Sequence, residues 1–61
     1  MTISVFCKII NAYTRVRVLD RYGFAGEYTV SELEAEFNAY TPIIDLKAYD
    51  YDIMYIRIDR L

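Results

Sequence analysis

The chain has 61 residues (7.2 kDa) and a net charge of −2, and 56% of its residues are hydrophobic, including seven Tyr and three Phe. One Cys and no His exclude an internal disulfide framework and a structural zinc site, and the length excludes a multidomain enzyme. We therefore expect a single domain over residues 1–61 that covers surplus apolar surface with a copy of itself or with a partner.

The beginning of the chain shows no pattern typical of export or membrane insertion. Residues Met1 to Ile10 are apolar, but Lys8 interrupts them, and neither a basic start nor a small-residue cleavage region is present. No stretch approaches the roughly 18 apolar residues of a membrane span. The lone Cys7 suits a reducing compartment. We expect a cytoplasmic protein, located in the host cytoplasm if a phage encodes it.

The first third of the chain predicts two strands. Apolar residues alternate over Thr2–Ile10, where β-branched side chains dominate. Asn11-Ala12 is a plausible turn, and Tyr13–Asp20 alternates between an apolar face and a face that carries Arg15 and Arg17. The pattern predicts an antiparallel hairpin of these two segments.

The next segment has two interpretations. Arg21–Gly26 contains two glycines and is typical of a loop. Alternatively, a hairpin turn near Arg21–Gly23 precedes a short strand at Phe24–Tyr28.

A capping box gives the clearest helix signal in the chain. Thr29 is the expected N-cap and Glu32 stands at the third helical position. The following apolar residues are spaced three, four and three apart, which is one helical stripe: Val30, Leu33, Phe37 and Tyr40. We expect the helix to end at Asn38 or before Thr41-Pro42, because Pro disfavours helical geometry in the residue before it.

The C-terminal third predicts at least one more strand. Ile43–Asp52 reads as a packed loop or a short edge strand, and Ile53–Leu61 as a strand that is largely apolar on both faces. The predicted fold is α+β with the order β-β-α-β, a small antiparallel sheet with one helix packed on it. Because so much strand surface is apolar, we expect this sheet to extend across a homodimer.

Charge is segregated along the chain. Residues 1–26 hold four bases and one acid, whereas residues 27–52 hold seven acids and one base. The corresponding local charges are +3 and −6, and the remaining tail carries +1. A nucleic-acid binder usually concentrates basic residues, so the acidic middle favours a basic protein partner over nucleic acid.

The residues needed for catalysis are missing. Acid–base chemistry by His is impossible, and Cys7 lies in an apolar segment with no His to activate it. The glycines form no phosphate-binding loop, and Asp50 and Asp52 supply too few oxygens for a calcium loop. We therefore expect a protein that is not an enzyme and that holds no metal or cofactor.

Two segments resemble the small inhibitors of uracil-DNA glycosylase that Bacillus podophages encode, which are DNA-mimic proteins. Tyr28–Phe37 is similar to the start of the family's helix: a hydroxyl cap, Ser and an acid, an apolar residue, Glu, and then an aromatic residue. Asp52–Leu61 is similar to its last strand, in which apolar residues lead into a basic–apolar–acidic–basic ending. Together the segments cover about a third of the chain.

The resemblance implies a homodimer with a joint antiparallel sheet and an apolar cavity between two helices. In the family, that cavity captures the side chain that the glycosylase inserts into the DNA minor groove, and acidic residues replace phosphates. Carried over to this chain, Glu32, Leu33, Glu34 and Phe37 stand at the family's positions, and the partner-binding hypothesis adds Glu36 as a phosphate replacement and Tyr40 as part of the apolar site. Leu33 stands where the family has Phe, and Phe37 where it has Tyr.

The leading hypothesis is a DNA-mimic inhibitor of uracil-DNA glycosylase that binds no nucleic acid. Another antagonist of a host DNA-binding enzyme and a structural or adaptor homodimer are the alternatives. A nucleic-acid-binding regulator that uses Arg15 and Arg17 is a fourth hypothesis.

Overall fold

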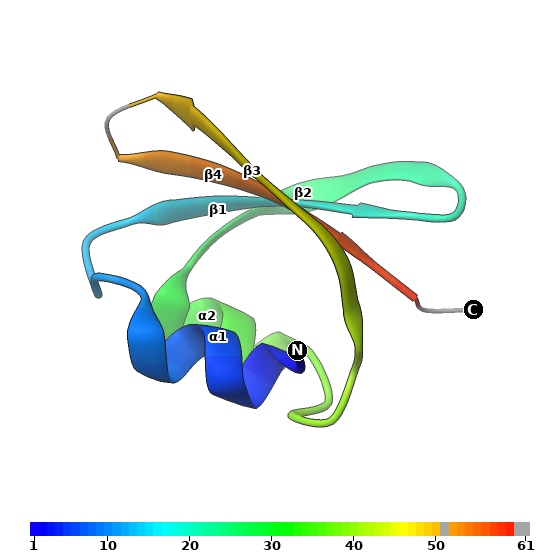
Figure 1. Cartoon of the computed structure of the whole chain (residues 1–61), viewed down its shortest axis with the longest axis horizontal. Helices are drawn as coiled ribbons and strands as arrows, with labels where there is room; N and C mark the ends of the chain where they lie inside the picture. The colour runs from blue at the N-terminus through cyan, green and yellow to red at the C-terminus, as the bar shows by residue number, and fades with distance from the viewer. Residues whose placement is uncertain (51, 60–61) are drawn as a thin grey trace.

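Two helices lie on one face of a four-stranded sheet in the computed structural model, which describes residues 1–50 and 52–59 (Figure 1). The elements in chain order are α1 (Ile3–Ile9), β1 (Arg15–Asp20), β2 (Gly23–Thr29), α2 (Val30–Glu36), β3 (Ile43–Asp50) and β4 (Ile53–Ile58). The α+β class is as expected, but the described residues form two helices rather than one. None of their helices is long and apolar enough to cross a membrane.

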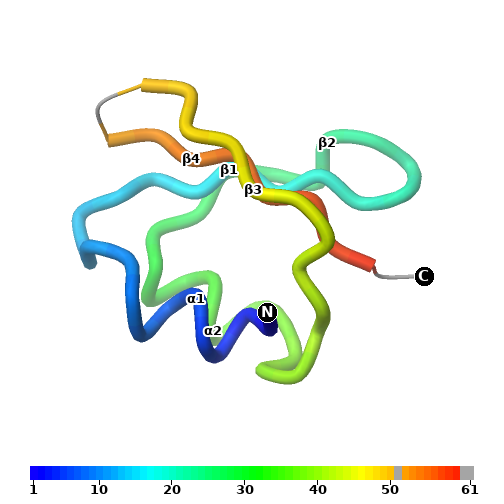
Figure 2. Tube along the Cα trace, viewed as in Figure 1, coloured from blue at the N-terminus to red at the C-terminus, as the bar shows by residue number. Residues whose placement is uncertain are grey.

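The sheet is mixed, with the strand order β2-β1-β4-β3. β1 pairs antiparallel with β2, and β3 pairs antiparallel with β4, whereas the central strands β1 and β4 are parallel. The expectation of a wholly antiparallel sheet is therefore wrong. The trace in Figure 2 shows that the chain leaves α2, turns below the helices and returns to the sheet along β3. In the strand order, β3 is one edge of the sheet.

Helix α1 replaces the strand predicted at Thr2–Ile10. Thr2 caps the helix, because its hydroxyl accepts a hydrogen bond from the Val5 N–H at 3.3 Å. Ile3, Phe6 and Cys7 are buried on one side, which is a helical spacing of three and four. The apolar residues of this segment fit both the alternation of a strand and the spacing of a helix. The structure forms the helix, which buries Ile3, Phe6 and Cys7 on one side.

The loop after α2 holds the start of α1 in place. The Ile3 N–H donates to the Thr41 carbonyl at 3.0 Å, and the Ser4 N–H donates to the Ala39 carbonyl at 2.9 Å. Thr2 and Pro42 form an isolated antiparallel bridge. These contacts satisfy N–H groups that have no partner within the helix at its start. The start of α1 and the loop after α2 therefore hold each other in position.

The predicted hairpin of Thr2–Ile10 with Tyr13–Asp20 is wrong, because β1 instead forms its hairpin with β2. The alternative with a turn near Arg21–Gly23 is confirmed. Gly23 occupies the turn with a φ of 115°, a conformation that favours glycine. The Tyr22 N–H donates to the Asp20 carboxylate at 2.8 Å, which stabilises the same turn.

The predicted start of the helix is confirmed, because α2 begins after Thr29, but the predicted end is wrong, because α2 already ends at Glu36. The last predicted strand is confirmed over Ile53–Ile58 as β4. Asp59 follows the strand, and Arg60 and Leu61 lie outside the described residues. Of the two interpretations of Ile43–Asp52, the edge strand is confirmed as β3.

The core lies between the helices and the sheet. β2 contributes only the partly buried Ala25 and Tyr28. The buried residues come from the other elements and from Phe37 at the end of α2: Ile3, Phe6, Cys7, Val16, Val18, Val30, Leu33, Phe37, Ile43, Ile56 and Ile58. The alternate residues of the strands point to the opposite side of the sheet, which no described helix covers. The fold therefore leaves one helical face and one bare sheet face for function.

Candidate functional site

Helix α2 carries most of the predicted partner-binding residues, and its start is fixed by reciprocal hydrogen bonds. The Glu32 N–H donates to the Thr29 hydroxyl at 3.2 Å, and the Thr29 N–H donates to the Glu32 carboxylate at 3.0 Å. The bond from the Thr29 backbone is the largest cause that lowers the pKa of Glu32, followed by the bond with its side chain. Glu32 is therefore ionised at neutral pH, and its carboxylate stabilises the start of the helix.

The cap predicts a pH-dependent stability. Because the pKa of Glu32 is lower in the folded chain, its contribution is complete above the unfolded pKa of about 4.3 and is lost as the pH falls toward the folded value. Glu32→Gln keeps an acceptor for the Thr29 N–H but does not titrate. We expect the variant to lose less stability than the wild type between about pH 6 and 3.

Urea unfolding followed by circular dichroism at both pH values measures this difference. Glu36→Gln is the matched control, since it removes a carboxylate from the end of the same helix and leaves the cap intact. An identical pH dependence in wild type and Glu32→Gln would contradict the assignment.

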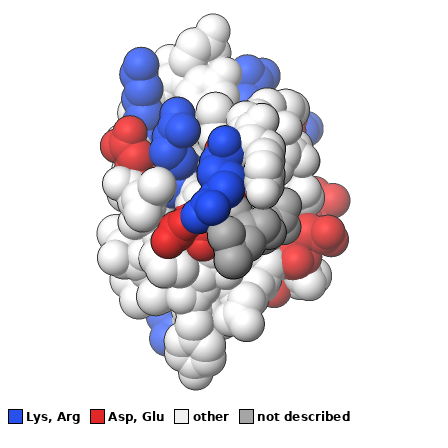
Figure 3. All heavy atoms as spheres, turned by 90° about the vertical axis from the view of Figure 1, so that its right-hand side faces the viewer, with Lys and Arg blue, Asp and Glu red and all other residues white. Residues whose placement is uncertain are grey.

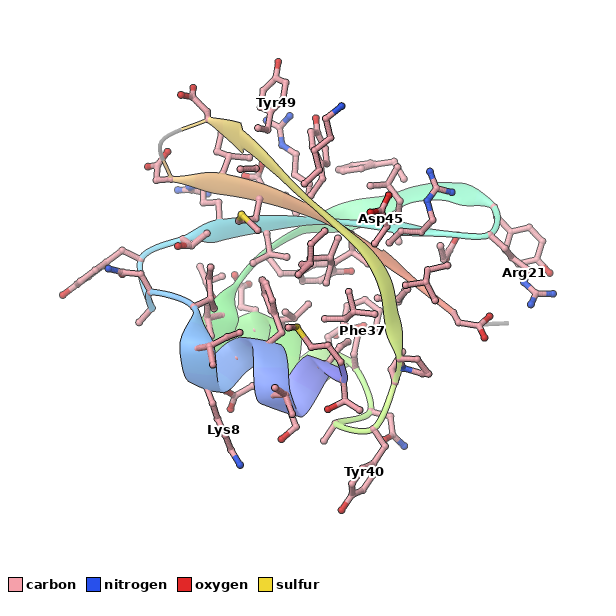
Figure 4. All side chains as sticks on the ribbon, viewed as in Figure 1. Lys8, Arg21, Phe37, Tyr40, Asp45 and Tyr49 are labelled. Carbon is pink, nitrogen blue, oxygen red and sulfur yellow. The ribbon has the colours of Figure 1, made fainter. Side chains whose placement is uncertain are left out.

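The apolar members of the predicted site separate into two groups. Leu33 and Phe37 have exposed fractions of 0% and 5%, and the Phe37 ring packs edge-on against Tyr28 with centroids 5.3 Å apart. Tyr40 is 83% exposed on the turn after α2. Figure 4 shows Phe37 between the layers and Tyr40 projecting away from them. Within one chain, the structure therefore does not bring Leu33, Phe37 and Tyr40 together as an open apolar slot.

The acidic members all reach solvent. Glu32, Glu34 and Glu36 are exposed, and none of them forms a salt bridge with another described residue. Glu34 also lines a shallow groove between the two helices, together with Ser4 and Lys8. The helical face thus presents carboxylates with no cation bound to them in the described part of the chain.

Cys7 lies near Glu34, and its thiol is not activated as a nucleophile. Its side chain is buried, and burial raises the pKa of the thiol to about 11, with the Glu34 carboxylate as the second cause. A protonated thiol is a poor nucleophile. Cys7 therefore acts as a core residue, as the sequence suggested. The described residues contain no group of three or more His, Cys, Asp or Glu placed to hold a metal ion.

The bare sheet face carries a second cluster, which the sequence reasoning did not assemble. Arg17 lies at its centre and donates to the Glu27 carboxylate at 2.8 Å and to the Tyr55 hydroxyl at 2.9 Å. Its guanidinium carbon lies 5.8 Å from the Tyr49 ring centroid and 5.6 Å from that of Tyr55. Arg15 donates to the same Glu27 carboxylate at 3.2 Å.

These contacts change the pKa values on the sheet face. The bond from Arg17 is the largest cause that lowers the pKa of Glu27, and the bond to Glu27 is the largest that raises the pKa of Arg17. The sequence predicts Arg15 and Arg17 on one strand face. It does not predict their partners, because Glu27 follows a segment that is a loop in one of two interpretations and Tyr49 lies in another segment with two interpretations.

Comparison with known proteins finds no matching family, curated protein or solved structure. The described residues present two candidate functional surfaces, the acidic helical face and the bare sheet face.

Proposed function

We propose that the chain is a non-catalytic inhibitor that occupies the DNA-binding groove of a uracil-DNA glycosylase. Glu32, Glu34 and Glu36 replace DNA phosphates in this proposal. The observation that carries it is the exposure of all three carboxylates on one capped helix, without a salt bridge to another described residue. The helix lies in the segment that resembles the inhibitor family.

Glu32 and Glu36 lie on the same side of α2, because residues four apart are neighbours on a helix surface, and they are separated by about 6 Å along its axis. Glu34 lies on the other side of α2, beside α1. A basic groove built for phosphates therefore meets negative charge on both sides of α2. Charge of this kind accelerates association with a groove of opposite sign.

Burial divides the apolar residues between two roles. Tyr40 is the exposed aromatic residue at the end of the stripe, so it is the member open to an apolar side chain of the partner. Leu33 and Phe37 hold α2 against the core from beneath, and we assign them a positioning role.

The proposal includes a homodimer whose sheet continues through β3. This edge strand is exposed from Ile44 to Asp50, and a free strand edge can pair with another strand. Asp45 and Lys47 point to the bare face, because they lie opposite Arg57 and Tyr55 of β4. Antiparallel pairing of two copies centred on Leu46 brings Asp45 of each copy opposite Lys47 of the other, which is a favourable cross-strand pair.

A uracil-release assay with purified glycosylase tests the function. We expect inhibition by the wild type that weakens with added salt, and association slowed on the order of tenfold in Glu34→Gln/Glu36→Gln. Asp50→Asn/Asp52→Asn is the control that makes the same change in net charge at two exposed carboxylates outside α2. Absence of inhibition at micromolar excess would sink the proposal. Light scattering of the chain alone and with the enzyme measures the dimer and the complex together.

A further inference from the structure

The bare face of the sheet is chemically unlike the helical face. Its strands present the following described residues on the side away from the helices: Arg15, Arg17 and Leu19 of β1, Phe24, Glu27 and Thr29 of β2, Asp45, Lys47, Tyr49 and Asp50 of β3, and Ile53, Tyr55 and Arg57 of β4. Cationic and aromatic side chains dominate this set. The helical face of α2, in contrast, carries three glutamates and no cation.

The charge of this face is opposite to that of the chain. Its described residues include four cations and three carboxylates, a local charge of +1, whereas the chain as a whole is −2. One of these carboxylates, Glu27, forms salt bridges with both Arg15 and Arg17. Lys47 and Arg57 form no salt bridge with any described residue. Figure 3 shows one side of the molecule, where most of the Lys and Arg atoms lie in the upper part with some Asp and Glu beside them, and further Asp and Glu lie at the right-hand edge.

The aromatic residues of this face are exposed and held in place. Phe24 and Tyr49 are 64% and 61% exposed. The rings of Tyr49 and Tyr55 meet edge-on with centroids 5.2 Å apart, and the Arg17 guanidinium lies near both. Preorganised exposed rings cost little entropy when a flat ligand stacks on them.

A hollow of about 370 Å³ crosses the same face. Leu19, Phe24 and Tyr55 give it apolar walls, and Lys47 and Arg57 lie among its lining residues with Asp45. The volume lies at the small end of the range of ligand pockets. The hollow therefore combines aromatic stacking surface, cations for phosphate, and a carboxylate that can accept hydrogen bonds from amino groups.

We propose that the bare sheet face binds single-stranded nucleic acid. Bases stack on Phe24 and Tyr49, and Lys47 and Arg57 contact phosphates. Stacking on sheet aromatics together with cations along the backbone is the general chemistry of single-strand recognition. A duplex does not offer its base faces for stacking, and no described helix projects from this face to enter a groove.

A second copy of the chain is a poorer occupant of this face. Packing two such faces together places cations against cations, which opposes association. Dimerisation through the β3 edge leaves the face open. The inference is independent of glycosylase inhibition, because the acidic residues of α2 lie on the other side of the sheet (Figure 1).

Fluorescence anisotropy with a labelled 12-nucleotide oligothymidylate tests the inference. For the two phosphate contacts by Lys47 and Arg57, we expect the affinity to fall roughly sevenfold between 50 and 200 mM salt. Tyr49→Ala removes one stacking platform and should weaken binding at least about fivefold. Lys47→Ala should weaken it and also reduce the salt dependence, and the same sequence as a duplex should bind more weakly.

Matched controls come from the helical side. Lys8→Ala and Tyr40→Ala remove an exposed cation and an exposed aromatic residue that project away from the sheet (Figure 4), and both should bind like the wild type. Glu34→Gln/Glu36→Gln should also retain oligonucleotide binding, which separates this surface from the proposed inhibitory one. No salt-sensitive binding at about 100 µM protein, the weak end of non-specific affinity, would overturn the inference, as would equal losses in the Lys8 and Tyr40 controls.

Discussion

Phe6→Ala is expected to remove about 3–5 kcal/mol of stability, among the largest losses expected for a single substitution in the core. Phe6 is 1% exposed and is among the largest fully buried side chains of the core. Truncating a buried Phe costs about 3–5 kcal/mol, whereas a chain of this length typically has only about 3–9 kcal/mol of stability. Urea unfolding followed by far-UV circular dichroism measures the loss, with the wild type as reference.

Ile9→Ala is the matched control on the same helix. Ile9 is equally apolar but mostly exposed, so its truncation should change stability by no more than about 0.5 kcal/mol. The Phe6→Ala and Ile9→Ala variants also test whether this segment is a helix or a strand, because α1 buries Phe6 and exposes Ile9. In the alternating pattern Ile3, Val5, Cys7 and Ile9 share a face; a large cost for Val5→Ala and Ile9→Ala with a small one for Phe6→Ala would contradict α1.

Helix α2 could be predicted because its signals are local. The capping box needs only Thr29 and Glu32, and the stripe continues through Leu33 to the cap residue Phe37. Each signal spans fewer than nine residues, so no distant segment has to be known. The same reasoning explains why β4 was found, since it has five strongly apolar or β-branched residues within six.

Helix α1 could not be predicted in the same way, because two periods fit its sequence. Ile3, Val5, Cys7 and Ile9 alternate, while Ile3, Phe6 and Cys7 also match a helical spacing. Short apolar segments with β-branched residues favour strands on propensity alone. The choice depends on contacts of the loop after α2 with the first turn and on packing of α1 beside α2, neither of which the local sequence contains.

The two surfaces differ in how much the sequence could show. The acids of α2 lie within five residues of one another, so their grouping is visible without a structure. The sheet face collects Arg17, Glu27, Tyr49 and Tyr55 from four strands. Its assembly requires the parallel pairing of β1 with β4, which no local pattern encodes and which long-range packing of the core decides.

Phe37→Ala and Tyr40→Ala are expected to separate core packing from partner contact in the predicted apolar stripe. Phe37 is buried against Tyr28, so its truncation should cost about 3–5 kcal/mol, comparable to the stability of the whole domain. Tyr40 is exposed, so Tyr40→Ala should change stability by no more than about 0.5 kcal/mol. Urea unfolding of the two variants measures both values.

The same pair decides which residue meets the glycosylase in the proposed complex. Tyr40→Ala should remain folded and lose inhibition, because the exposed ring is the part of the stripe that a partner can reach. Phe37→Leu keeps an apolar side chain in the core and should retain most inhibition if Phe37 only positions α2. A folded Phe37→Leu that no longer inhibits, beside a Tyr40→Ala that inhibits fully, would instead place Phe37 in the contact and require α2 to move away from the core on binding.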